Sequence, residues 1–61
     1  MTQKETIAAI RAMGMTCRVR EGEYRVNFLN GSEATAYYTD NKGDAVGTAM
    51  AMKAAQEKGA N

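Results

Sequence analysis

The stretch that decides the fold is residues 15–39, which read MTCRVR, EG, EYRVNFL, NGS and EATAYYT as five successive pieces. Apolar and polar residues alternate in the first and third pieces, and alternation at period two is typical of strands with one buried face. The separating pieces contain glycine, asparagine and serine, which favour turns. The stretch therefore predicts three antiparallel strands, at about 15–20, 23–29 and 33–39, joined by two short connections.

The first connection, Glu21-Gly22, sets the register of the first hairpin. A two-residue turn needs positive φ values, which glycine adopts at little cost. The resulting register opposes three apolar pairs on one face: Met15 with Phe28, Cys17 with Val26, and Val19 with Tyr24. On the other face, it brings Arg18 directly across from Arg25.

The second connection, residues 30–32, is compatible with more than one register of the third strand. A two-residue Asn-Gly turn would place polar residues of the third strand in the core, so parity argues against it. A three-residue loop, or an equivalent bulge, keeps the apolar residues together by opposing Phe28 to Ala34, Val26 to Ala36 and Tyr24 to Tyr38. We therefore predict that Tyr38 is buried and that Tyr37 lies on the open face, although a slip of one residue would exchange them.

Helices are expected before and after these strands. Thr2 and Glu5 fit a capping box for a helix at about 3–13, and Gly14 fits the left-handed residue that follows a helix end. After the strands, a helix is expected at about 41–58, with Asp40 or Asn41 as its N-cap. The sequence thus predicts one α+β domain over 1–61, in the order helix, three-stranded antiparallel meander, helix (αβββα), with both helices on one face of the sheet.

The last helix has two stripes of residues. The sheet-facing stripe is expected to contain Ala45, Val46, Ala49 and Met52. A second stripe of small residues recurs every four positions: Gly43, Gly47, Ala51 and Ala55. A glycine inside a helix costs about 1 kcal/mol relative to alanine, so close packing is expected there. Either the first helix crosses at this stripe through Ala8 and Ala12, or the stripe is an exposed interface for a homodimer or a partner helix, centred on Gly43, Gly47 and Ala51.

Composition excludes several classes of function. The chain has 61 residues, a net charge of +1, one cysteine and no histidine, so neither a disulfide framework nor a usual metal site is expected. Cys17 falls on the predicted buried face without a cationic neighbour to form its thiolate, so we expect no enzyme and no cofactor. No apolar run approaches the roughly 20 residues of a membrane span, and we expect a cytoplasmic protein without membrane contact.

The open face of the sheet is the candidate binding surface. In the predicted register, Arg18, Arg25 and Tyr37 form one row across the strands, with Arg20 and Asn27 beside it. Opposed like charges are unfavourable unless an anion relieves them, and an aromatic ring adds a surface for stacking. An acidic protein surface or a phosphate backbone would suit this row. The alternative is a solvated face on which Arg20 pairs with Glu23 and Arg25 lies over Tyr37.

The order of elements and the alanine-rich last helix resemble the double-stranded RNA-binding domain. That family uses a basic cluster at the start of its last helix and a long loop between its first two strands. Here the corresponding positions hold Lys42-Gly43-Asp44 and the tight Glu21-Gly22 turn. The resemblance therefore concerns topology, and it makes a nucleic-acid-binding module the alternative function.

A second resemblance lies in the sequence itself. The strings GEYRVN at 22–27 and EATAYYTD at 33–40, followed by Asp44-Ala45 and Thr48-Ala49, are similar to small proteins encoded by phages and plasmids of proteobacteria. That resemblance implies a mobile genetic element, whose accessory proteins often act stoichiometrically on host or defence proteins, CRISPR effectors included. We therefore expect a non-enzymatic protein that binds, and as an anti-CRISPR protein would inhibit, a host or defence protein.

Overall fold

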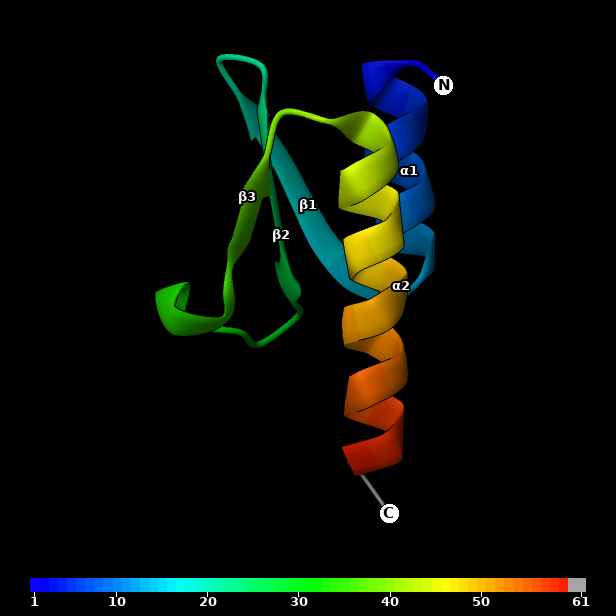
Figure 1. Ribbon diagram of the computed structural model, residues 1–61, viewed down its shortest axis with the longest axis vertical. Helices are drawn as coiled ribbons and strands as arrows, with labels where there is room; N and C mark the ends of the chain where they lie inside the picture. The colour runs from blue at the N-terminus through cyan, green and yellow to red at the C-terminus, as the bar shows by residue number, and fades with distance from the viewer. Residues whose placement is uncertain (60–61) are drawn as a thin grey trace.

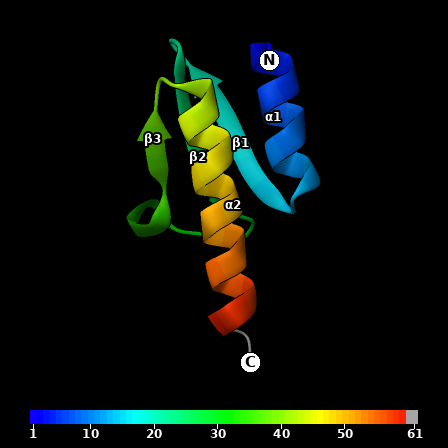
Figure 2. The same ribbon diagram turned by 45° about the vertical axis from the view of Figure 1, so that its right-hand side comes forward.

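The computed structural model describes residues 1–59 and has the predicted αβββα order. The sheet order is β1-β2-β3, all antiparallel, and both helices pack on the same face of this open sheet (Figure 1, Figure 2). The elements are α1 (Gln3–Ala12), β1 (Met15–Arg20), β2 (Glu23–Phe28), the 3-10 helix η1 (Glu33–Thr35), β3 (Tyr37–Thr39) and α2 (Lys42–Gly59).

The two ends of α1 are specified by the residues that the sequence indicates. The Thr2 hydroxyl accepts from the Glu5 amide at 3.1 Å, and the Glu5 carboxylate accepts from the Thr2 amide at 2.8 Å, which completes the capping box. At the other end, Gly14 has φ +82°, a conformation that favours glycine. The chain can therefore turn directly from α1 into β1.

The first hairpin has the predicted register throughout. Met15 lies across from Phe28, and the pairing continues without a bulge to Arg20 and Glu23. Both turn residues have positive φ, 51° for Glu21 and 80° for Gly22, as expected for a tight two-residue hairpin. Turn length and side-chain alternation thus agree, which fixes the sidedness of β1 and β2.

The core lies between the sheet and the two helices. Its fully buried apolar residues come from α1, β1, β2 and α2: Ile10, Met15, Cys17, Tyr24, Val26, Ala45 and Ala49. The sheet-facing stripe of α2 is confirmed, since Val46 and Met52 pack against this core. Asn41 is the N-cap, because its side-chain oxygen accepts from the Asp44 amide at 2.8 Å.

The predicted third strand is wrong in both length and register. Residues 33–35 form η1, and β3 contains just Tyr37–Thr39. Its register places Tyr38 across from Arg25 and Tyr37 across from Val26, one residue away from the predicted pairing. Consequently Tyr37 lies on the helix side and Tyr38 on the open side, the reverse of what the sequence pattern indicated.

A buried amide explains this difference. Asn27 is 1% exposed, although the sequence placed it on the open face as a contact residue. Its Nδ2 donates to the Ser32 carbonyl at 2.9 Å, and its Oδ1 accepts from the Thr35 hydroxyl at 2.7 Å and from the Phe28 amide at 2.8 Å. These bonds fold the connection over Asn27, so residues 33–35 cannot pair with β2 and β3 begins later.

The small-residue stripe of α2 does not pack against α1. A β-carbon at Gly47 would meet no atom within 4 Å, and Ala8 and Ala12 of α1 are exposed. The expectation that the first helix crosses there is therefore wrong. The other stripe residues, Gly43 and Ala51, are also exposed, and a homodimer or partner helix at this stripe stays a prediction.

Within residues 1–59, neither α1 nor α2 combines the length and the apolar character needed to cross a membrane.

Candidate functional site

The candidate site is the face of the sheet that points away from the helices, called here the outer face. Its side chains come from β1, β2 and β3, and η1 projects on this side, away from the helices, at one end of the sheet (Figure 1). We define the outer face by Thr16, Arg18, Arg20, Glu23, Arg25, Tyr38 and Glu33.

Two arginines lie opposite each other on the outer face, as the sequence predicts. Arg18 of β1 is exposed and is the direct cross-strand neighbour of Arg25 of β2. Among residues 1–59, the Arg18 side chain makes no hydrogen bond or ion pair, whereas Arg25 Nη2 lies 3.4 Å from Glu33 Oε2. Within residues 1–59, the charge of Arg25 is therefore neutralised by a carboxylate of the same molecule, and the charge of Arg18 is not.

Tyr38 and Glu33 complete the surroundings of Arg25. Arg25 Nε donates to the Tyr38 hydroxyl at 3.3 Å, and that hydroxyl donates in turn to Glu33 Oε1. The hydrogen bond from Tyr38 and the Arg25 charge lower the pKa of the Glu33 carboxyl, and the Tyr38 bond and the Glu33 charge raise the pKa of Arg25. Glu33 thus stays ionised and holds Arg25 at the β3 side of the row.

The sequence-predicted row must therefore be corrected at its third member. Tyr38, not Tyr37, lies next to Arg25, and 45% of Tyr38 is exposed. The Tyr37 hydroxyl instead donates to Asp44 Oδ2 of α2 at 2.6 Å, which links β3 to the helix layer. Tyr37 consequently leaves the candidate site, and a stacking role for it no longer has a basis.

Two further residues of the outer face are Arg20, which the sequence predicts, and Glu33, which it does not. Arg20 is exposed on the outer face across from Glu23, but the two form no ion pair in the part of the chain described. Glu33 was not identified as a site residue. A signal for it existed, because two opposed arginines require a nearby acid and Glu33 is the acid in the connection that follows β2.

Two hollows flank the arginine row. One, of about 310 Å³, lies toward the first turn and is bounded by Arg18, Arg20, Glu21, Glu23, Arg25 and Tyr38. The other, of about 480 Å³, lies toward η1 and shares the two arginines of the row, with Glu33 and Asn27 on its far side. Arg18 and Arg25 therefore stand between two recesses into which acidic groups of a ligand can reach.

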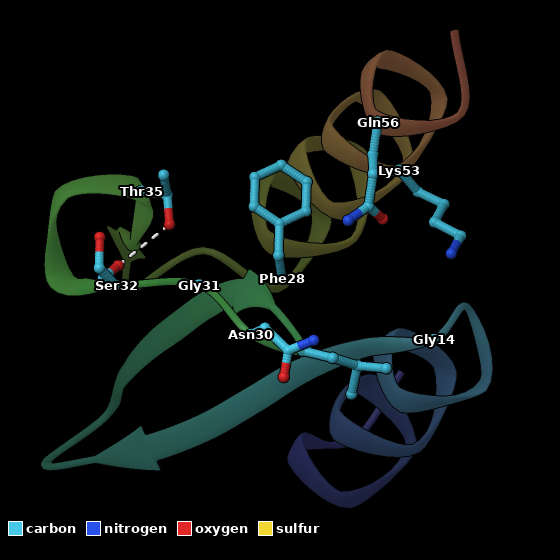
Figure 3. A pocket seen from close by; sticks show the side chains of 9 residues that line it. Gly14, Phe28, Asn30, Gly31, Ser32, Thr35, Lys53 and Gln56 are labelled. Atoms are coloured by element: carbon cyan, nitrogen blue, oxygen red, sulfur yellow. Dashed lines mark hydrogen bonds between the residues drawn. The ribbon is translucent and has the colours of Figure 1, made fainter. Parts of the chain in front are cut away.

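A separate groove of about 460 Å³ lies between the end of β2 and α2 (Figure 3). Phe28 and the Asn30-Gly31 turn line one side, and Lys53 and Gln56 of α2 line the other. At its edge, the Thr35 hydroxyl lies 3.0 Å from the Ser32 carbonyl and shares its proton between this oxygen and Asn27 Oδ1. Its single cationic group is Lys53. The outer face, with three guanidinium groups, is therefore the stronger candidate for ligand binding.

No group of three or more cysteine, aspartate or glutamate side chains within the described part of the chain could hold a metal ion. Comparison with protein-family models, with curated proteins and with solved structures finds no match to this chain.

Proposed function

We propose that this chain is a non-enzymatic interaction protein that binds a host or defence protein through its outer face. The observation that carries the proposal is the exposed Arg18, unpaired within residues 1–59 and directly opposite Arg25, with the exposed Tyr38 ring beside them. Arginine and tyrosine are the residues that, with tryptophan, most often dominate the energy of protein interfaces. A partner's acidic group at Arg18 would relieve the repulsion between the two guanidinium groups.

The charge of the outer face favours a protein partner over a nucleic acid. Its three arginines are matched by three acids around the same hollows, Glu21, Glu23 and Glu33, and the net charge of the whole chain is +1. A phosphate backbone gains affinity from an excess of cationic groups, which this face does not have. A protein surface, by contrast, can offer acids to Arg18 and basic or polar groups to the surrounding glutamates.

A stoichiometric rather than a catalytic role fits the groups that are present. Cys17 is fully buried, and burial raises the pKa of its thiol, against a smaller opposing effect of Arg11, so little thiolate forms at neutral pH. The resemblance to small proteins of mobile elements supplies the setting. In that setting the partner is a host or defence protein, such as a CRISPR effector, and binding inhibits it.

Affinity capture tests the proposal directly. The tagged protein is tested in three forms: wild type, Arg18→Glu and Lys4→Glu. Each form is incubated with proteobacterial lysate, with and without nuclease treatment. Both substitutions change the charge equally at exposed positions, but Lys4 lies on α1, behind the sheet. We expect one stoichiometric partner that is retained by wild type and Lys4→Glu and lost from Arg18→Glu. Equal retention by all three forms, or capture that disappears with nuclease treatment, would contradict the proposal.

A further inference from the structure

We infer that the outer face recognises an acidic segment of its partner, and that Glu33 is an internal competitor for that segment. The inference rests on the proposed function, because it names the chemistry of the ligand at the same face. Its starting point is that the chain already binds one carboxylate there. Glu33 accepts from both Arg25 and Tyr38, so the molecule contains an example of the group for which this face is arranged.

One end of the arginine row, at Arg25, is paired with a carboxylate, and the other end, at Arg18, has no such pair within residues 1–59. Glu33, which projects from η1, reaches Arg25 and Tyr38 on the β3 side. On the β1 side, Arg18 has the same type of donor group and is not paired with any carboxylate in residues 1–59. A guanidinium binds a carboxylate through two parallel N–H groups, so Arg18 is ready to take one from a ligand.

Glu33 is held where it can compete. It starts the short helix η1, which the buried Asn27 fixes to β2 through Ser32 and Thr35. The Glu33 side chain itself is 71% exposed, and its contact with Arg25 is the long 3.4 Å ion pair. An exposed pair of this kind is weak, so an incoming carboxylate can replace Glu33 at Arg25 at little cost.

The neighbouring acids restrict what can bind. A phosphodiester chain carries a charge on every unit and would bring several of them close to Glu21, Glu23 and Glu33. A protein segment carries separate carboxylates on flexible side chains, which can reach Arg18 and Arg25 individually. The expected ligand is therefore a carboxylate-bearing peptide segment. Glu33 weakens the binding of densely charged polyanions to this face.

The test uses a synthetic peptide of alternating glutamate and alanine, with a matched peptide of glutamine and alanine and a single-stranded oligonucleotide as comparisons. Binding is followed by NMR through the Nε–H signals of Arg18 and Arg25. We expect the glutamate peptide to shift both signals and the glutamine peptide to shift neither. An oligonucleotide that shifts them more strongly at equal salt, or shifts that depend on protein concentration alone, would overturn the inference in favour of nucleic acid or a second copy of the chain.

Two substitutions separate recognition from competition. Arg18→Gln should weaken the glutamate peptide by about tenfold, as expected for loss of a charge-assisted hydrogen bond. Glu33→Gln keeps an acceptor for Tyr38 but removes the charge, and it should tighten the peptide about two- to fivefold, the size expected for an exposed ion pair. Glu57→Gln on α2 removes the same charge elsewhere and should leave affinity unchanged. Weaker binding by Glu33→Gln would show that Glu33 positions Arg25 and would refute competition.

The outcomes for the ligand class and for the proposed function are distinguishable. If lysate capture depends on Arg18 but the glutamate peptide does not bind, the function stands and the acidic ligand is refuted. If neither lysate capture nor peptide binding depends on Arg18, the proposed function and the acidic ligand are both refuted.

Discussion

The two strand connections of this sheet specify their registers by different means. The β1–β2 turn does so through the backbone, because both of its residues adopt positive φ and no side chain is needed to hold it. The β2–β3 connection does so through a side chain. Asn27 bonds to three groups of the chain around it, and the connection folds over that amide.

The difference shows what kind of information each connection contains. Alternation of apolar residues defines a register where the turn is short, because the number of turn residues and the parity must agree. Alternation gives a wrong answer where a polar side chain is buried, since that side chain takes over hydrogen bonds that a strand would have made. Here the result is a one-residue shift that exchanges Tyr37 and Tyr38.

The largest expected effect is that of Asn27→Ala. It removes the acceptor of the Phe28 amide, one of the donors to the Ser32 carbonyl and the acceptor of the Thr35 hydroxyl, and we expect a loss of about 3 kcal/mol in the free energy of unfolding. That is a large share of the roughly 3 to 9 kcal/mol expected for a chain of 61 residues. Urea denaturation followed by circular dichroism measures it.

Thr16→Ala is the matched control for that variant. Thr16 is the cross-strand neighbour of Asn27, and its hydroxyl donates to the Asn27 carbonyl at 3.2 Å, but it is only half-buried. We expect a loss of less than about 1 kcal/mol. Equal losses for the two variants would show that the Asn27 amide does not specify the second connection.

Gly31→Ala should have the second largest effect. A β-carbon at Gly31 would overlap Asn27 Oδ1 and lie 2.6 Å from Asn27 Cγ and 2.8 Å from Thr35 Oγ1. The amide must therefore move, and we expect a loss of about 2 kcal/mol. Because both variants act on the same amide, adding Gly31→Ala to Asn27→Ala should cost much less than it does alone. Strict additivity of the two losses in urea denaturation would contradict this coupling.

The contrast between the two connections also explains how much of the fold can be predicted from the sequence. The capping box at Thr2 and Glu5, the end of α1 at Gly14 and the whole first hairpin follow from local rules, and each is confirmed. The burial of Asn27 is not predictable by those rules, because its partners lie five and eight residues away, Ser32 in the predicted loop and Thr35 in a segment that the pattern reads as strand. The predicted crossing of α1 at Gly47 was wrong for a related reason: spacing alone does not say whether an element packs against the stripe.

The candidate site was predictable to the same extent as the registers. The opposition of Arg18 and Arg25 depends on the first hairpin and is confirmed. The third member of the row depends on the second connection, so Tyr37 was wrong and Tyr38 takes its place. Glu33 depends on the second connection as well, since η1 brings it to Arg25.

Gly22→Ala tests the first connection and should cost less. Gly22 has φ +80°, but a β-carbon there would meet no atom within 4 Å. The penalty is therefore that of the backbone conformation alone, about 1 kcal/mol. The register should not change, because the alternation of β1 and β2 still requires it. Cross-strand NOEs between β1 and β2 check this, and a shift in pairing would show that the alternation does not keep the register once the turn is weakened.

Tyr37→Phe should have the smallest effect, and one that depends on pH. The Tyr37 hydroxyl donates to the Asp44 carboxylate, and this bond is the main reason why the pKa of Asp44 is lowered and that of Tyr37 is raised. A lowered acid pKa adds stability above its ordinary value, and this stability is lost as the pH falls through the folded-state pKa. A raised tyrosine pKa adds stability that is lost as the pH rises through the folded-state value, above 10.

The bond should therefore stabilise the protein between about pH 4 and pH 10, from the ordinary pKa values of the two groups. We expect Tyr37→Phe to lower the Tm by roughly 2 to 4 °C near pH 7 and by progressively less as the pH falls through the lowered pKa of Asp44, because protonation removes the carboxylate that accepts the bond. Asp44→Asn keeps an acceptor but cannot titrate, so in that background the effect of Tyr37→Phe should not change between pH 3 and pH 7. If it still changed, another acid would hold β3 to α2, and the helix-side position of Tyr37 would not be what fixes the second register.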